Sequence, residues 1–222
     1  MIGFDNMVYD FAKRTFDIIS SILAIVFFAV PWVIITVIIK IQSPGPAIYE
    51  ARRIGKNGKV FTLYKFRSMR VDSGAVHATT LRGDPRIFPF GEIMRKSKLD
   101  ETPQLFNILK GEMSVIGPRP EDEENSGKFY VGKYKDILSV KPGLSSPASL
   151  FDYTHGEKYK NEDDYVREFL PKKLDVELYY VKNRSFVYDI QIIYNTIITI
   201  TQIVLGKEDF VEPKELGLCR KV

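Results

Sequence analysis

The stretch that decides the architecture is residues 18–39, IISSILAIVFFAVPWVIITVII, in which none of the 22 side chains is charged. A helix rises about 1.5 Å per residue, so about 20 apolar residues are enough to cross the hydrocarbon core of a bilayer. The run is longer than the apolar part of a secretory signal peptide, and no small-residue cleavage site follows it. The sequence therefore predicts a membrane-embedded helix in the N-terminal part of the chain.

Two features bear on how this run lies in the membrane. Lys13 and Arg14 precede it and Lys40 follows it, so the tendency of positive residues to stay in the cytoplasm selects no direction of crossing. Pro31 sits in the middle of the run and bends a helix because it has no N–H to donate. We predict Pro31 as a membrane break within a re-entrant hairpin that enters and leaves on the same side. A straight span remains the alternative.

Outward from this run, local patterns predict a small domain. Ser43-Pro44-Gly45-Pro46 ends the membrane segment, since prolines and glycine interrupt a helix. Residues 47–53 and 60–66 are strand candidates around a Gly-Lys-Asn-Gly turn, which indicates a β-hairpin. A loop is expected over residues 71–86, and the acidic residues 121–124 are expected to be solvated. Helices are expected over residues 100–110, 162–182 and 186–205.

These elements together predict a mostly helical α+β fold. It comprises an N-terminal re-entrant membrane helix hairpin, a short β-hairpin, and amphipathic helices at the membrane interface around a small cytosolic catalytic domain. We divide the chain into an N-terminal membrane segment, residues 1–42, a catalytic domain, residues 43–205, and a C-terminal tail, residues 206–222.

Composition excludes several classes of site. The single cysteine, Cys219, allows no internal disulfide, and only two histidines, His77 and His155, are present. Two histidines are few for a His-rich metal centre and leave little choice for the histidine of a Ser-His-Asp triad. Residues 1–120 carry a net charge of +7 and residues 121–222 a net charge of −3. The basic half suits an anionic membrane face or phosphate-bearing substrates, and no nucleic-acid-binding motif is present.

The densest set of reactive side chains lies between Arg95 and Arg119. Asp100 and Glu101, which we call the dyad, are adjacent carboxylates at an expected helix start. A helix N-terminus attracts phosphate, carboxylates can hold Mg²⁺, and a carboxylate can attack phosphorus to form an acyl-phosphate type intermediate. An Asp in this position is more commonly a helix cap, and the residues alone favour that interpretation.

The motifs, taken in order, supply a further argument. The chain resembles the monotopic phosphoglycosyl transferases of the bacterial sugar transferase family over about residues 11–205. The segments that carry the resemblance are KRTFD at 13–17, SPGP at 43–46, YKFRSM at 64–69, DPR at 84–86, LDETPQLFN at 99–107, KGEMS at 110–114, GPRP at 117–120, KPG at 141–143 and DVELYYV at 175–181.

The resemblance implies a ping-pong reaction. Asp100 would attack the β-phosphate of a UDP-sugar and release UMP, and polyprenol phosphate would then take the phosphosugar. Glu101 would assist through Mg²⁺ or by accepting a proton, and both carboxylates would be metal ligands. The residues implied to bind substrate are Lys65, Arg67, Arg95, Pro118 and Arg119. The resemblance also implies the re-entrant form of the N-terminal helix.

The same resemblance implies the surroundings of the enzyme. Its partners would be a UDP-sugar, polyprenol (undecaprenyl) phosphate and the lipid bilayer, with downstream glycosyltransferases and a second copy of the chain as further candidates. Its place would be the bacterial inner membrane, with the active site on the cytosolic face, at the first membrane step of glycoconjugate assembly.

The sequence departs from the family pattern in three places. Val30 stands before Pro31 where the family often has Ser, Glu112 replaces a more usual Asp, and LSSPAS at 144–149 replaces a stretch that often reads ITGWAQ. The last of these is a candidate contributor to the choice of nucleotide or sugar, so no sugar is assigned. Two other functions stay open: a catalytically inactive scaffold of a glycan assembly complex, and a hydrolase of nucleotide-sugars.

Overall fold

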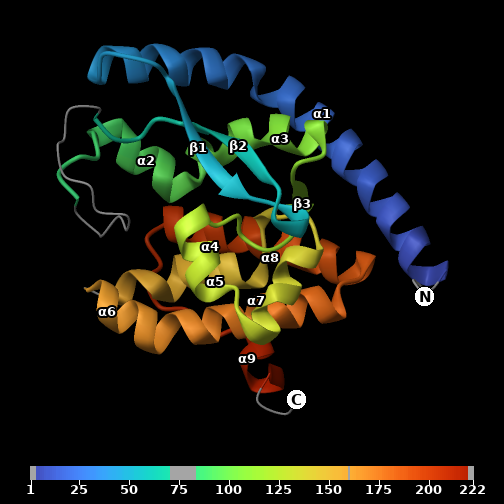
Figure 1. Cartoon of the computed structure of the whole chain (residues 1–222). Coiled ribbons are helices and arrows are strands. Elements are labelled where there is room, and N and C mark those ends of the chain that lie inside the picture. The colour runs from blue at the N-terminus through green and yellow to red at the C-terminus, as the bar shows by residue number, and fades with distance from the viewer. Residues whose placement is uncertain (1–3, 71–83, 160, 220–222) are drawn as a thin grey trace.

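The computed structural model describes residues 4–70, 84–159 and 161–219, and most of the loop predicted over 71–86 falls outside them. The described part is mostly helical with two small sheets (Figure 1), which confirms the predicted α+β class. Its elements are α1 Phe4–Gln42, β1 Ile48–Ile54, η1 Lys56–Gly58, β2 Val60–Phe66, α2 Pro89–Ser97, η2 Leu99–Gln104, α3 Leu105–Lys110, β3 Ser114–Ile116, α4 Glu123–Phe129, η3 Gly132–Ser139, β4 Gly143–Ser145, α5 Pro147–His155, η4 Gly156–Lys158, α6 Glu162–Asp164, η5 Tyr165–Phe169, α7 Leu170–Asn183, α8 Phe186–Val204 and α9 Lys214–Cys219.

The long helix α1 contains the apolar run. It is one helix of 39 residues with Pro31 inside it, and it bends over the rest of the domain (Figure 1). Within the described residues, its part Met7–Gln42 is long and apolar enough to cross a membrane. The two separate arms of the predicted hairpin are not seen. Proline removes one hydrogen bond of the ladder, and residues on both sides of Pro31 pack against the domain, so the helix continues.

The predicted β-hairpin is confirmed. β1 and β2 pair antiparallel, with Ile48 opposite Phe66 and Ile54 opposite Val60. The turn between them places Asn57 at φ 58° and Gly58 at φ 75°, a left-handed geometry that Asn and Gly adopt more readily than other residues. This hairpin matters for function because β2 carries Lys65.

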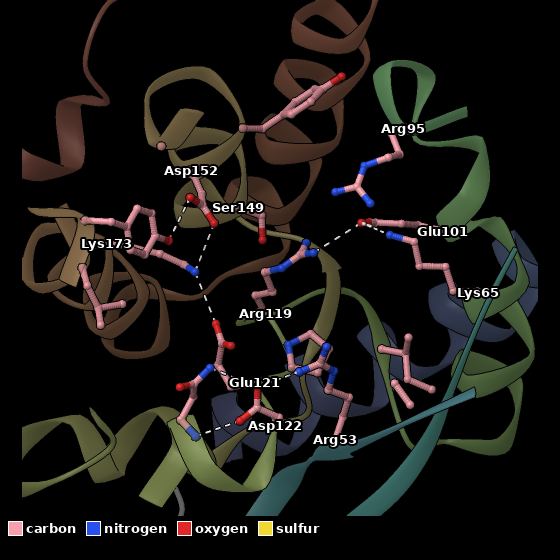
Figure 2. Close-up of a pocket in the computed structure, with 18 of the residues that line it drawn as sticks. Arg53, Lys65, Arg95, Glu101, Arg119, Glu121, Asp122, Ser149, Asp152 and Lys173 are labelled. Atoms are coloured by element: carbon pink, nitrogen blue, oxygen red, sulfur yellow. Dashed lines mark hydrogen bonds and ion pairs between the residues drawn. The ribbon is translucent and has the colours of Figure 1, made fainter. Parts of the chain in front are cut away.

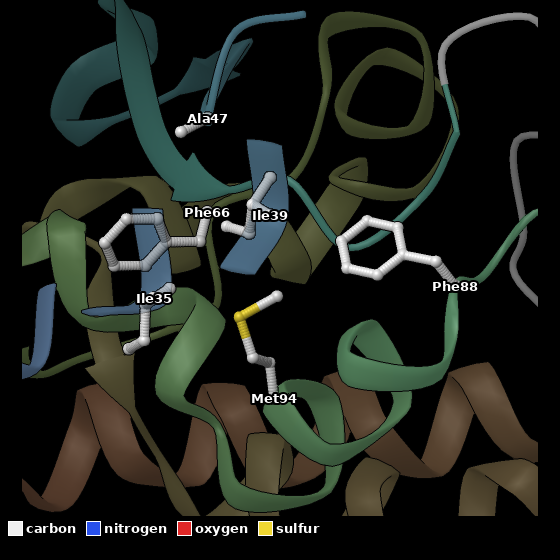
Figure 3. Close-up of a cluster of buried hydrophobic side chains, with 6 residues drawn as sticks. All are labelled: Ile35, Ile39, Ala47, Phe66, Phe88 and Met94. Carbon is white, nitrogen blue, oxygen red and sulfur yellow. The ribbon is translucent and has the colours of Figure 1, made fainter. Parts of the chain in front are cut away.

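One face of α1 is buried against the hairpin and α2. Figure 3 shows the cluster, in which Ile35 and Ile39 of α1 meet Phe66 of β2 and Met94 of α2. Burying such side chains stabilises the fold by about 1.5–3 kcal/mol each. The opposite face of α1 exposes large apolar side chains such as Val26, Phe27 and Val30. A large exposed apolar surface of this kind marks a membrane or protein contact.

A short parallel sheet lies under the N-terminal half of α1. β3 pairs with β4, with Ser114 opposite Gly143. The loop after β3 passes so close to β4 that a Cβ on Gly117 or on Gly143 would collide with the backbone of the other strand's loop. Only glycine allows that approach. This close approach of the two backbones determines where the GPRP loop, residues 117–120, leaves the sheet.

Helices α7 and α8 form the C-terminal half of the domain, as predicted. Pro171 is the second residue of α7, and the chain before it is already helical through α6 and the π-helical turn η5, so residues 162–183 continue through the proline without a break. Asp189 on α8 is buried and accepts hydrogen bonds from Tyr9 at 2.9 Å and Lys13 at 2.8 Å, which ties the start of α1 to α8. The other face of α8 exposes apolar residues such as Ile190 and Ile197.

Candidate active site

The dyad lies in the first turn of η2, a short 3-10 helix. Lys98, not Asp100, holds the N-cap position, with a left-handed backbone at φ 57° that ends α2 and begins η2. Neither oxygen of Asp100 accepts a hydrogen bond in the described part of the chain. The interpretation of Asp100 as a helix cap is therefore wrong, because a cap side chain must accept from a backbone N–H.

Asp100 is a buried carboxylate with one cation beside it. Its side chain is 1% exposed, and the Lys65 ammonium lies 2.8 Å from Oδ2 as an ion pair that lacks the angles of a hydrogen bond. Burying a carboxylate without hydrogen bonds costs free energy. The structure thus keeps the lone pairs of Asp100 available, an arrangement typical of a nucleophile or a metal ligand.

Glu101 has a different environment. Its Oε1 lies 3.8 Å from the ammonium of Lys65, 3.8 Å from that of Lys98 and 3.4 Å from the Arg119 guanidinium. Burial alone would raise the pKa of Glu101, but the charges of Lys98, Arg119 and Lys65 outweigh it and hold the pKa well below its ordinary value. Glu101 is therefore ionised at neutral pH, and its charge in turn raises the pKa of Arg119.

The backbone of the GPRP loop is held from two sides. The amide of Gly143 donates to the carbonyl of Pro118 at 2.8 Å, and the amide of Arg119 donates to Oε1 of Glu177 on α7 at 3.1 Å. Glu177 is 1% exposed and its Oε2 has no hydrogen-bond partner among the described residues. Burial raises the pKa of Glu177 to about 8. These contacts orient the Arg119 side chain toward Glu101.

A cleft of about 1120 Å³ opens beside the dyad, and Lys65, Arg95, Lys98, Glu101 and Arg119 line it. Figure 2 shows Arg95 directed into the cleft on the side of Glu101. The Arg95 side chain forms no hydrogen bond or ion pair with the residues that the structure describes, so this end of the cleft has excess positive charge. Such an end is suited to a diphosphate.

The structure thus brings together five of the predicted site residues: Lys65, Arg95, Asp100, Glu101 and Arg119. Arg67 also lines the cleft, but its guanidinium is bound to the chain that follows α1. Arg67 is buried, and its two terminal nitrogens donate to the carbonyls of Pro44, at 2.8 Å, and Ser43, so it fastens the chain that leaves α1. Pro118 contributes a backbone carbonyl to the loop contact. Substrate binding by Arg67 and Pro118 stays a prediction, as does the membrane break at Pro31.

Sequence reasoning missed the opposite side of the cleft. There Lys173 of α7 lies 3.1 Å from Oδ2 of Asp152 and 3.2 Å from Oε1 of Glu121; we call these three residues the far-wall triad. The expectation that Glu121 is solvated was wrong, because α7 brings the Lys173 ammonium to it. No motif signals this cluster, since its members come from three segments and meet only after folding.

The dyad is also the best place for a divalent cation. Among the residues that the structure describes, no group of three or more His, Cys, Asp or Glu side chains could hold a metal. Mg²⁺ commonly takes one or two carboxylates and completes its shell with water and substrate phosphate. Asp100, whose buried oxygens accept no hydrogen bond, fits that demand together with Glu101.

Comparisons with known proteins agree with this geometry. The sequence profile described as "Bacterial sugar transferase" matches residues 8–203. The chain is 38% identical to the UDP-N-acetylgalactosamine-undecaprenyl-phosphate N-acetylgalactosaminephosphotransferase of Aeromonas hydrophila, over 87% of this chain and 44% of that protein. It is 37% identical to the exopolysaccharide production protein PSS of Rhizobium leguminosarum bv. phaseoli, over 84% of this chain and 94% of that protein.

A third relative, the undecaprenyl-phosphate galactose phosphotransferase of Salmonella typhimurium, is 36% identical over 84% of this chain and 40% of that protein. The chain therefore spans less than half the length of the Aeromonas and Salmonella relatives and nearly all of the Rhizobium one. Because the profile match extends across most of the described domain, from α1 to the end of α8, the chain belongs to the bacterial sugar transferase family.

Proposed function

We propose that this chain is a glycosyl-1-phosphate transferase, which moves a phosphosugar from a UDP-sugar to polyprenol (undecaprenyl) phosphate. The observation that carries the proposal is Asp100, a buried carboxylate with no hydrogen bond, beside Lys65 and Glu101, which line the cation-rich end of a large cleft. The named acceptor of the Aeromonas and Salmonella relatives, undecaprenyl phosphate, supports the same reaction.

The reaction would proceed in two displacements at one phosphorus. In the first, an Asp100 oxygen bonds to the β-phosphorus while the bond from that phosphorus to the bridging oxygen breaks, and UMP leaves with the electron pair. In the second, an oxygen of the polyprenol phosphate bonds to the same phosphorus, and the Asp100 carboxylate is released. Lys65 and Arg95 lie where they could neutralise the diphosphate during both steps.

The role of Glu101 follows from its charge. Its pKa is lowered, so at neutral pH it is a weak base. A phosphate monoester has a second pKa of about 6 and already carries most of its charge at neutral pH, so the acceptor needs little help to lose a proton. We therefore assign Glu101 to holding Lys98, Arg119 and a divalent cation. When bound, Mg²⁺ would polarise the phosphate oxygens at the dyad.

We further propose that α1 is re-entrant, with both ends on the cytosolic side of the inner membrane. Arg14 donates to the carbonyl of Leu109 at 2.9 Å, and Trp32 donates to Thr102 at 2.8 Å. The same small domain therefore contacts α1 near its start and near its end. A straight span would carry those contacts through about 30 Å of hydrocarbon. The exposed apolar faces of α1 and α8 would lie in the bilayer, with α8 at its interface.

Lipid-dependent release of UMP tests the reaction. Purified protein with Mg²⁺ is incubated with a panel of UDP-sugars, with and without undecaprenyl phosphate. We expect about one UMP per enzyme without lipid and sustained turnover with it. Asp100→Asn should lower the rate by a factor on the order of 10⁴, whereas the surface control Glu92→Gln should retain it. Turnover without lipid would indicate a hydrolase, and no release with any UDP-sugar would indicate a scaffold.

Cysteine labelling tests the topology independently. In a Cys219→Ser background, single cysteines at residues 10 and 58 should both react with a membrane-impermeant maleimide in inside-out vesicles and not in intact spheroplasts. A cysteine at Phe27, on the exposed apolar face of α1, should react in neither. Labelling of residues 10 and 58 from opposite sides would make α1 a true span.

A further inference from the structure

The far wall of the cleft holds a set of charges that the proposed reaction does not use. The far-wall triad joins α5, α7 and the loop before α4, and Oδ1 of Asp152 also accepts a hydrogen bond from Tyr165 at 3.0 Å. One role of these contacts is structural, because they fasten three segments together. A structural role alone does not explain why the triad lines the same cleft as Glu101.

Exposure within the triad is uneven. The Lys173 side chain is 5% exposed, whereas those of Asp152 and Glu121 are 26% and 22% exposed. The ammonium lies between the two carboxylates (Figure 2), and the more exposed members of the triad are the two carboxylates, whose oxygens are acceptors. Burial raises the pKa of Asp152, but Lys173 and Arg119 lower it further, so its net pKa lies below the ordinary value. An ionised carboxylate only accepts hydrogen bonds.

The two ends of the cleft differ in sign. Two carboxylates and one ammonium leave the triad with one net negative charge when Arg119, which lies between the two ends (Figure 2), is counted with the dyad. Around the dyad, two carboxylates face Lys65, Lys98, Arg95 and Arg119, which leaves two net positive charges. A diphosphate is attracted to the dyad end and repelled by the triad. A hydroxyl group, which can donate to a carboxylate, is suited to the triad.

One face of α5 connects the two ends. Ser149, Asp152 and Tyr153 all line the cleft, and a spacing of three to four residues puts them on one side of a helix. The Lys98 ammonium lies 3.8 Å from Oε1 of Glu101 and 4.1 Å from the centre of the Tyr153 ring. This face of α5 therefore begins directly beside the dyad.

We propose that this face of α5, together with Glu121, forms the subsite for the hydroxyl groups of the transferred sugar. The inference rests on the proposed function and deepens it. In a UDP-sugar the sugar ring is joined directly to the β-phosphate that Asp100 would attack, whereas the ribose is one phosphate further away. The subsite that begins beside the dyad is therefore that of the sugar.

A further observation favours the sugar over the ribose. The Aeromonas and Salmonella relatives name different sugars, N-acetylgalactosamine and galactose, and the same lipid. The sugar is therefore the part of the reaction in which these two relatives differ, and a subsite beside the dyad is where such a difference would be recognised.

Binding measurements test the subsite without turnover. In an Asp100→Asn parent, calorimetry gives the Kd of UDP and of UDP-glucose, UDP-galactose, UDP-N-acetylglucosamine and UDP-N-acetylgalactosamine. Asp152→Asn should weaken the best UDP-sugar by about 10-fold while the Kd of UDP changes less than about twofold. It should also change the ratio of Kd between epimers. Asp175→Asn, on α7 and bonded to Lys133 and Tyr134 outside the cleft, should change neither.

Other results would overturn the subsite. Equal weakening of UDP and UDP-sugars would place the ribose there, and unchanged Kd values in a folded Asp152→Asn protein would leave the triad a purely structural feature. Ser149→Ala, which leaves the ion pairs intact, guards against misfolding of the first variant and should also weaken UDP-sugars selectively. A parent that binds no UDP-sugar would overturn the proposed function itself, which is a separate result.

Discussion

The two walls of the cleft hold their charges in opposite ways. On the far wall Lys173 lies within 3.2 Å of both carboxylates of the triad. On the dyad wall Lys65 lies 2.8 Å from Asp100, but Glu101 is 3.4–3.8 Å from its three cations, and the Arg95 side chain has no ion-pair partner among the described residues. Closely paired charges stabilise a fold at the point where three segments meet. Loosely paired charges with a positive excess leave room for an anionic ligand, so the dyad wall is incomplete without one.

The largest expected difference between the two walls is in stability after one cation is removed from each. Lys173→Met leaves two carboxylates facing each other, and we expect the free energy of unfolding to fall by about 3 kcal/mol, as when one partner of a buried ion pair is lost. Arg95→Met removes an unpaired cation, so stability should change by less than about 0.5 kcal/mol. Urea denaturation in detergent, followed by circular dichroism, measures both.

Arg95→Met, which should hardly change stability, should have a large effect on activity. Because Arg95 is placed to meet the diphosphate, Arg95→Met should raise KM for the UDP-sugar by about 10-fold or more. A stable Lys173→Met protein, or a strongly destabilised Arg95→Met protein, would show that the walls do not divide their tasks in this way.

Two buried carboxylates that contact Arg119, Glu177 and Glu101, should respond to pH in opposite directions. Glu177 has an ordinary pKa of 4.5 that is raised to about 8 by burial, despite the Arg119 amide and Lys173. Between these values the unfolded chain loses this proton and the folded chain keeps it, so stability falls as pH rises from about 4.5 to about 8. Glu101, with its lowered pKa, stabilises the fold above its ordinary value, and that contribution is lost as pH falls below it.

Glu177→Gln isolates the first of these effects. The amide keeps an acceptor for the Arg119 N–H and does not ionise, so the variant should gain stability over the wild type on the order of a few kcal/mol at pH 9 and little at pH 5. Urea midpoints at pH 5, 7 and 9 measure this. Parallel curves for the two proteins would mean that Glu177 does not titrate in this range.

The sequence predicted what depends on local pattern. The uncharged run predicted α1, and the strand pattern around a Gly-Lys-Asn-Gly turn predicted the β-hairpin. Both signals are local, so spacing and turn chemistry act directly. Asp100 and Glu101 needed more than a local signal, because the residues alone favoured a helix cap and only the ordered series of family motifs indicated catalysis.

What it did not predict depends on segments that meet only in the folded chain. Glu121, Asp152 and Lys173 are distant in sequence, so nothing in residues 121–124 indicated an ion pair with α7. The cap interpretation of Asp100 failed because η2 begins after Lys98, whose backbone is left-handed, and the N-cap position therefore lies two residues before Asp100. The continuity of α1 through Pro31 likewise depends on packing of Ile35 and Ile39 against other elements.

The smallest effect we expect concerns how the dyad wall is attached to α1. Trp32 donates from its indole to the Thr102 hydroxyl at 2.8 Å, and that hydroxyl donates to the carbonyl of Leu99 at 2.7 Å. Trp32 also packs against Phe106, with 5.5 Å between ring centres. The membrane helix thus contacts the short helix that carries the dyad, so Trp32 is a positioning residue.

Trp32→Phe keeps an aromatic ring and removes the hydrogen bond, so we expect kcat to fall about 3- to 10-fold, as for loss of one neutral hydrogen bond, with KM unchanged. Thr102→Val should have the same effect, and the double variant should be no worse than either single one, because both remove the same contact. Additive losses would show independent roles. A positioning residue acts on the dyad without contacting the nucleotide-sugar, so its loss should lower kcat and leave KM unchanged. A rise in KM at constant kcat would instead place Trp32 in substrate binding.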